Sequence, residues 1–67
     1  MGLNKIKLKR MEEGLTQMEL AKAVGVTRQT IGLIESSKYN PTLSLCINIC
    51  RALNTTLDAL FWEEVDE

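Results

Sequence analysis

Two short helical patterns, separated by a three-residue turn, constrain the fold of this 67-residue chain more than any other feature. Thr16 stands three residues before Glu19, which is the spacing of a capping box, so a helix is expected to start there. The pattern stops at Gly25, because glycine readily takes the left-handed conformation found at helix ends. Thr27 can then cap a second helix. Two helices joined so closely must pack across each other.

Apolar residues at helical spacing give each of these two helices one inward face. Ala21 is expected where the helices come closest, because a larger side chain there would push them apart. Two inward faces and a tight turn predict a helix-turn-helix over residues 16–36. The inward positions are Leu20, Ala21 and Val24 on the first helix, and Ile31 and Ile34 on the second.

The residues in and around this motif carry a family resemblance. The stretch from Gln17 to Ser36 resembles the helix-turn-helix of the Cro/C1-type (Xre) family. The resemblance continues through Lys38-Tyr39-Asn40-Pro41 and the following helix to Phe61-Trp62, so it covers nearly the whole chain. It implies an all-α fold, namely a compact five-helix, lambda-repressor-like domain. In that family the third helix enters the major groove of DNA, and the protein usually acts as a dimer.

A first helix is expected to run from a cap at Asn4 to Glu13, with Gly14 as its stop. The resemblance implies a structural ion pair between Arg10 and Glu35, which would tie this helix to the end of the third. The lysines of this helix are either phosphate contacts or part of an ordinary solvated face. Two lines of residues compete for the inward face, namely Leu8, Met11 and Leu15, and Ile6 and Arg10.

A fourth helix is expected after Pro41, with Thr42 as its cap and Asn54 at its end. Its sequence is apolar over much of its circumference, so this helix should be central to the core. The residues expected to face inward are Leu43, Cys46, Ile47, Cys50 and Leu53, with Leu45 and Ile49 on the flank.

The fifth helix, capped by Thr55 or Thr56, has a larger apolar side than a monomer of this size needs. A surplus apolar face predicts a dimer interface or a surface for another protein. The alternative is that one aromatic side chain simply covers the fourth helix. The predicted interface residues are Leu57, Leu60, Phe61 and Trp62. We therefore expect residues 1–67 to form one domain, in which residues 57–67 supply this surface and an acidic tail.

A helix-turn-helix places the start of its second helix against base edges and the start of its first helix against phosphates. Arg28 and Gln29 suit bidentate recognition of guanine and adenine, respectively. Gln17 can donate its amide to a phosphate. The predicted base-reading residues are Arg28, Gln29, Thr30 and Leu33. The predicted phosphate contacts are Gln17, Thr27, Lys38, Tyr39 and Asn40.

Several of these positions have a second interpretation. Thr27 can serve mainly as a helix cap, and Thr30 can offer a hydroxyl to a phosphate or a methyl group to thymine. Leu33 can touch thymine methyls or be partly buried, and Tyr39 can pack on the fourth helix. Gly32 offers no side chain for base reading, which either permits close approach to DNA or is neutral drift. Readout should therefore depend on few residues.

Charge is distributed unevenly in a chain whose formal net charge is −1. Residues 1–57 hold eight basic and four acidic residues, a net of +4, whereas residues 58–67 hold five acidic residues. Phosphate attraction falls off over a Debye length of about 8 Å at physiological salt, so DNA binding needs only a local basic face. The acidic tail should lie away from DNA. It either orients the domain or only keeps it soluble.

Composition argues against most other functions. The chain has no histidine, and its two cysteines, Cys46 and Cys50, would share a helix face at a separation beyond usual disulfide geometry. They are expected to be small core residues, with a metal or redox pair as the alternative. Because no nucleophile stands beside a base and no glycine loop suits phosphate, we expect no enzyme, no cofactor and no metal.

The sequence thus predicts a sequence-specific regulator of transcription that binds double-stranded DNA. It is expected to be a homodimeric repressor on a palindromic operator. The alternative is an antitoxin-like or accessory module that acts through a protein partner. Because no signal peptide or membrane-spanning run is recognised, we expect a cytoplasmic protein without a membrane partner.

Overall fold

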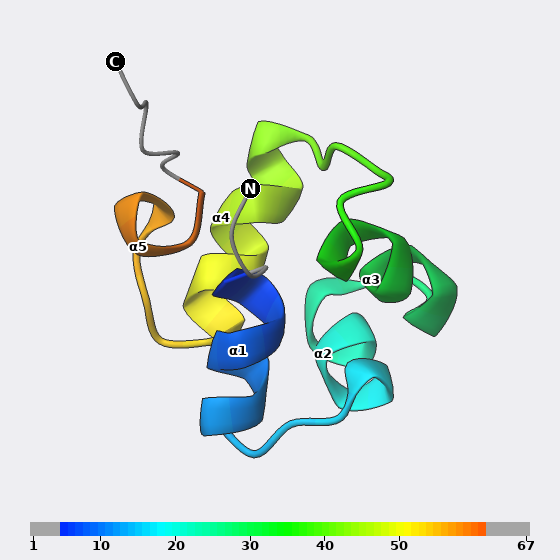
Figure 1. Cartoon of the computed structure of the whole chain (residues 1–67), viewed down its shortest axis with the longest axis horizontal. Helices are drawn as coiled ribbons and strands as arrows, with labels where there is room; N and C mark the ends of the chain where they lie inside the picture. The colour runs from blue at the N-terminus through cyan, green and yellow to red at the C-terminus, as the bar shows by residue number, and fades with distance from the viewer. Residues whose placement is uncertain (1–4, 62–67) are drawn as a thin grey trace.

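The computed structural model describes residues 5–61, and these residues form five α-helices without a strand (Figure 1). The predicted all-α, five-helix fold is therefore confirmed. Asn4, the expected cap of the first helix, lies outside the described residues, as does Trp62. The helices are α1 (Lys5–Glu12), α2 (Gln17–Val24), α3 (Arg28–Glu35), α4 (Leu43–Ala52) and α5 (Leu57–Phe61).

Local hydrogen bonds at the helix ends explain why the helices begin and end where they do. The Thr16 hydroxyl accepts from the Glu19 amide at 3.0 Å, and the Glu19 carboxylate accepts from the Thr16 amide at 2.8 Å. Gly25 ends α2 in the left-handed conformation, with φ of 81°. The hydroxyls of Thr27 and Thr42 cap α3 and α4. Each accepts a hydrogen bond from the backbone amide three residues later in the chain. The predicted caps of the motif are therefore confirmed.

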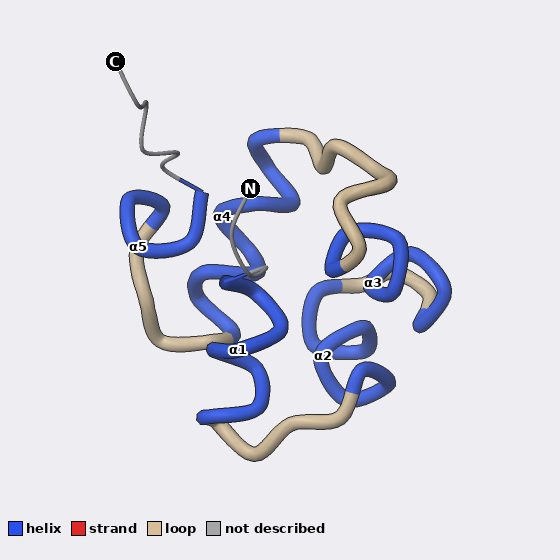
Figure 2. The backbone as a smooth tube through the Cα atoms, viewed as in Figure 1, coloured by secondary structure: helices blue, strands red, loops and turns tan. Residues whose placement is uncertain are grey.

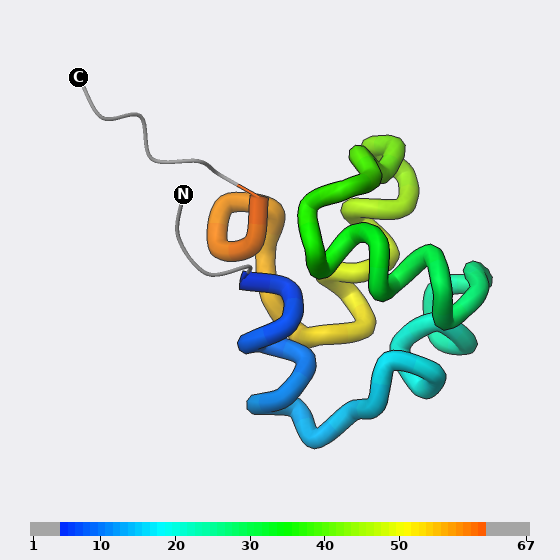
Figure 3. The backbone as a smooth tube through the Cα atoms, turned by 45° about the vertical axis from the view of Figure 1, so that its right-hand side comes forward, coloured from blue at the N-terminus to red at the C-terminus, as the bar shows by residue number. Residues whose placement is uncertain are grey.

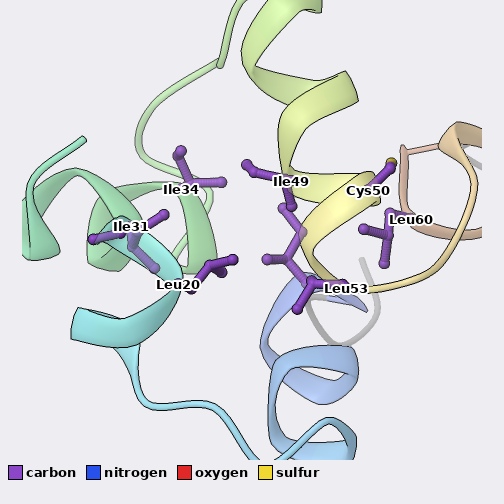
Figure 4. Packing of buried hydrophobic residues seen from close by; sticks show 9 residues of the cluster. Leu20, Ile31, Ile34, Ile49, Cys50, Leu53 and Leu60 are labelled. Atoms are coloured by element: carbon purple, nitrogen blue, oxygen red, sulfur yellow. The ribbon is translucent and has the colours of Figure 1, made fainter. Parts of the chain in front are cut away.

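Helix α4 runs through the middle of the molecule, with α5 on one side and the α2–α3 pair on the other (Figures 1 and 2). Helix α1 packs against α5 and α3. Figure 4 shows side chains from α2, α3, α4 and α5 converging on one centre. The largest wholly buried side chains of this centre are Leu20, Ile31, Ile49 and Leu53, and Ala21 is wholly buried beside them.

The inward face of α1 is the line of Ile6 and Arg10, both of which are buried. Leu8 and Met11 on the competing line are 44% and 59% exposed. An arginine thus takes a core-facing position while two apolar residues face outward. Arg10 can do so because Glu35 of α3 neutralises its charge there.

One residue of α4 lies differently from the expectation. Leu43 was expected to face inward, but its side chain is 67% exposed. It begins α4, and this first turn extends past α1 and α2 beside the α3–α4 loop (Figure 1). The apolar spacing of α4 was correct, but it could not show where the neighbouring helices end. Further along α4, Ile49 is wholly buried although it was placed on the flank.

None of the helices within residues 5–61 has the length and apolar character needed to cross a bilayer.

Candidate nucleic-acid interface

The outer face of α3 carries the predicted base-reading residues. Arg28, Gln29 and Leu33 are exposed, and Thr30 is half-buried. Figure 3 shows α3 on the outside of the molecule, continuing directly into the α3–α4 loop. In that loop the predicted phosphate-contacting residues are likewise exposed, namely Lys38, Tyr39 and Asn40. The predicted contacts of α3 and of the loop thus lie on one segment of the chain, in which they are accessible while Ile31, Ile34 and Glu35 face inward.

Thr27 and Thr30 form the N-terminal corner of this face. The Thr27 hydroxyl accepts from the Thr30 amide at 3.1 Å, so Thr27 does serve as the cap of α3. The two hydroxyl oxygens lie 3.0 Å apart and share a hydrogen bond. Both side chains are therefore already engaged with each other at the start of the helix. Thr27 is nevertheless an exposed residue, so it lies where a phosphate could approach the start of α3.

A buried ion pair fixes the other end of α3. The Arg10 Nε donates to Glu35 Oε2 at 2.6 Å, and Arg10 Nη2 donates to Glu35 Oε1 at 3.3 Å. Arg10 Nη1 also donates to the Leu15 carbonyl at 2.7 Å, so the guanidinium holds the α1–α2 turn as well. Both side chains are buried, and each ionised group has several hydrogen-bond partners. The pair implied by the family resemblance is therefore present in the structure.

Gln17 lies between this ion pair and Arg28. Its amide nitrogen donates to Glu35 Oε1 at 3.0 Å, and its amide oxygen accepts from Arg28 Nη1 at 2.9 Å. Sequence reasoning treated Gln17 and Arg28 as separate DNA contacts and missed this connection. The available signal was that Arg28 and Glu35 are seven residues apart, which places them on one face of a helix. That signal did not show that the start of α2 lies opposite the same face.

The predicted dimer-interface residues lie in different environments. Leu57 is 36% exposed, Phe61 is half-buried against the core, and Leu60 is only 8% exposed. Leu60 therefore belongs to the core of the single chain and offers little surface to another molecule. Trp62 and the acidic residues that follow it lie outside the described residues.

The two cysteines are free and buried on α4. Burial raises the pKa of the Cys46 thiol, although a hydrogen bond to its backbone works in the opposite direction. Burial and the neighbouring Cys46 raise the pKa of the Cys50 thiol. Both thiols therefore stay protonated near neutral pH, a state that disfavours metal binding and nucleophilic chemistry. No group of three or more metal-ligating side chains occurs within residues 5–61.

Comparison with known proteins agrees with this geometry. Residues 6–60 match the helix-turn-helix family. The chain is 43% identical over 61 residues to the uncharacterized HTH-type transcriptional regulator YgzD of Bacillus subtilis, covering 91% of this chain and 92% of that one. It is 37% identical to the immunity repressor protein of Bacillus phage phi105, over 90% of this chain and 42% of the repressor.

A third relative is named as an antitoxin. The chain is 37% identical to antitoxin HipB of Escherichia coli, over 81% of this chain and 61% of HipB. The family match and the similarity to YgzD extend over nearly all of the described helices. The chain therefore belongs to the Cro/C1-type (Xre) helix-turn-helix family of DNA-binding transcriptional regulators.

Proposed function

We propose that this protein is a sequence-specific repressor that binds double-stranded DNA by placing α3 in the major groove. The observation that carries the proposal is the exposed polar start of α3, where Arg28 and Gln29 project next to the cap of the helix. Side chains at this end of a recognition helix reach base edges in helix-turn-helix complexes. Arginine suits the O6 and N7 atoms of guanine, and glutamine suits the N6 and N7 atoms of adenine.

The proposed phosphate contacts flank these two residues. Lys38 and Asn40 in the exposed α3–α4 loop would hold the backbone on one side of the groove, with Tyr39 between them. Gln17 stands at the first position of α2, where the positive end of the helix dipole favours an anion. Its amide has two hydrogens and gives one to Glu35, so the second remains for a phosphate oxygen.

The proposal includes a homodimer on a palindromic operator, with half-sites about one turn of DNA apart. Helix α5 would supply the contact, with Leu57 at its surface and Phe61 beside it. Figure 1 supports this arrangement, because α5 and α3 lie on different sides of α4. An α5 contact would therefore leave the reading face accessible. We place this homodimer in the cytoplasm. Each of its chains would form one domain over residues 1–67.

The immunity repressor among the relatives supports repression as the effect of binding. A small chain bound over a promoter would act by excluding polymerase. The alternative is an accessory module whose α5 surface meets another protein, and the antitoxin HipB among the relatives favours it. The two functions use the same apolar surface but predict different states of the purified chain. A homodimer covers this surface with a second copy, whereas an accessory module leaves it free.

Selection of bound duplexes from a random DNA pool tests both functions. A recovered palindrome would support a symmetric dimer and would also give the operator and its spacing. Light scattering on the purified chain should then give twice the monomer mass. The mass measured for a Leu57→Glu variant should fall towards that of the monomer. A monomer that enriches no duplex contradicts the repressor and favours the partner-dependent module.

A further inference from the structure

The chain has two thiols, those of Cys46 and Cys50, and the proposed function uses neither. They lie four residues apart on α4, so one turn of the helix brings them to the same face. Both are free, and both residues are buried, with 9% and 5% of their surfaces exposed. Cys50 belongs to the core cluster, where Figure 4 shows it beside Leu60, whereas Cys46 lies outside that cluster. The pair therefore extends from the core to its edge.

The two side chains lean the same way along α4. Helical side chains point towards the N-terminus of their helix, over the residue four positions earlier, so Cys50 leans towards Cys46. The Cys46 thiol reaches back to the Pro41 carbonyl at 3.9 Å, and a thiol is only a weak donor. Burial and, in addition, the charge of Cys46 raise the pKa of the Cys50 thiol, so the two groups are close enough to act on each other. Cys46 therefore gives up little if both sulfurs share one ligand.

The distance between the two positions suits a bridging cation better than a disulfide. Cβ atoms four residues apart on a helix are about 5–6 Å from each other. A disulfide needs about 3.5–4.5 Å, so forming one would deform the helix. Two metal–sulfur bonds in one line, each about 2.3 Å as for zinc, hold the sulfurs about 4.6 Å apart. A cation with two sulfur ligands therefore fits across one turn of α4.

The ligands restrict which cation can bind there. Among the described residues, the pair belongs to no group of three or more metal-ligating side chains. Structural zinc takes four ligands, so two cysteines are too few for it. Thiolates select soft cations. Hg²⁺ and Cu⁺ are soft cations that are stable with two sulfurs in one line, so the pair suits this class.

Protons and charge favour the divalent member of this class. Burial raises the pKa of both thiols, so a bound cation must displace a proton from each. Only a cation with a strong preference for sulfur can do so near neutral pH. Hg²⁺ and two thiols give a neutral bis-thiolate and two protons. Cu⁺ would leave one negative charge in the core, which is unfavourable there.

We propose that Cys46 and Cys50 form a site for one soft divalent cation of the Hg²⁺ class, with the metal joining both sulfurs across a turn of α4. Cys46 is at the edge of the core and supplies the first bond, and Cys50 supplies the second. Neither cysteine lies on α3 or in the α3–α4 loop, so the inference is independent of the proposed DNA reading. Failure of either one leaves the other standing.

Titration of the purified, reduced chain with HgCl₂ tests the site directly. Native mass spectrometry should show one mercury per chain and no retained chloride, because both sulfurs are bonded to the metal. In weakly buffered, slightly acidic solution, each mercury should release two protons. Circular dichroism should keep its helical signal. Retained chloride, a single released proton or loss of the helical signal would each overturn the bridged site.

A variant with the two thiols set apart is the matched control. Cys46→Ala with Ser44→Cys keeps two thiols on α4 but moves one to an exposed position on another face of the helix. Glutathione competes for the mercury of each protein, and a bridge resists it because the second sulfur is already held in place. The unaltered chain should need at least about tenfold more glutathione than the control for half release. Equal requirements would show that any two thiols suffice, and the inference would fail.

Two other cations test the class of metal. ZnCl₂ in excess should leave the uptake of mercury unchanged, because two thiols serve zinc poorly. Cu⁺, supplied as its acetonitrile complex, should bind and then be displaced by one equivalent of Hg²⁺. Zinc that blocks the uptake of mercury, or Cu⁺ that resists displacement, would contradict the assignment to a soft divalent cation.

Discussion

At the scale of single residues, the charged side chains of this protein divide into a buried pair and an exposed set. Arg10 and Glu35 are shielded from water and satisfied by each other and by neighbouring groups. Arg28 and Lys38 are exposed, and water screens their interactions. The same kind of residue therefore has a structural role in one place and a proposed recognition role in the other. Substitutions should separate these roles.

Arg10→Met should destabilise the fold by about 3–5 kcal/mol, because it leaves the buried Glu35 carboxylate without its cation. Urea denaturation followed by circular dichroism measures the loss. A double variant, Arg10→Met with Glu35→Leu, should recover much of it, since no unpaired buried charge remains. A single variant within about 1 kcal/mol of the unaltered chain would contradict the structural importance of the pair.

Arg28→Ala and Lys38→Ala should weaken DNA binding in different ways. Loss of a base contact at Arg28 should cost about 1–3 kcal/mol and relax the preference for one sequence. Loss of a phosphate contact at Lys38 should weaken all sequences similarly and reduce the salt slope by about one. Titrations of matched and mismatched duplexes over a range of salt measure both effects. If both variants affect the two duplexes equally, Arg28 does not read a base.

At the scale of helices, the sequence predicted local features well and tertiary ones poorly. The caps at Thr16 and Thr27 and the stop at Gly25 depend on residues within one turn, so the sequence was enough to place them. The inward face of α1 depends on Glu35, which is twenty-five residues away from Arg10. The pattern of α1 alone left two lines of residues open, and only the family resemblance indicated that Arg10 pairs with Glu35.

The candidate site divides in the same way. The exposed residues of α3 and its loop follow from the position of the motif in the sequence. The bonds of Gln17 to Arg28 and Glu35 arise only when α2 crosses α3. Spacing along one helix cannot predict which residue of another helix will lie against it. This is why single contacts were predicted but their connection was not.

Ala21→Leu should prevent α2 and α3 from packing closely, because Ala21 is wholly buried in the core. Overpacking of this kind costs about 1–3 kcal/mol or more, and we expect a lower melting temperature and weaker DNA binding. Ala23→Leu is the matched control, since Ala23 is exposed on the same helix. An Ala21→Leu variant that melts and binds like the control would count against this packing.

Two glycine substitutions should change stability in opposite directions. Gly32→Ala should stabilise the fold by up to about 1 kcal/mol, because alanine favours the helix interior and its Cβ meets only one atom, at 3.9 Å. Gly25→Ala should destabilise the fold by about 1 kcal/mol, because φ there is 81° and an L side chain is strained in that conformation. Thermal melting of both variants compares them. A loss of stability in Gly32→Ala would contradict the open space beside position 32.

At the scale of the whole molecule, a small core limits the stability of the single chain. A domain of this size buries only about 60% of the surface that its unfolded chain exposes. Most of the buried apolar side chains come from α2, α3 and α4, whereas α1 and α5 supply one each, Ile6 and Leu60. Association through α5 would therefore add apolar contacts to a chain whose own apolar core is small.

If the chain is a dimer, its melting temperature should rise with protein concentration, because mass action favours the folded associated state. Differential scanning calorimetry over a hundredfold range of concentration measures the effect. Leu57→Glu should abolish the dependence, since it puts a charge on the proposed contact surface. Leu43→Glu, at an exposed leucine on α4, is the matched control and should preserve it. A melting temperature independent of concentration contradicts the homodimer.

The contact of Arg10 with both Glu35 and the Leu15 carbonyl limits how this motif can be reused. A peptide cut to residues 16–36 would lose that arginine, together with α4, which packs against α2. Such a peptide would not keep its two helices in register, however well each is capped. Altered DNA preferences are therefore better grafted as side chains onto the intact five-helix scaffold than carried as an excised helix pair.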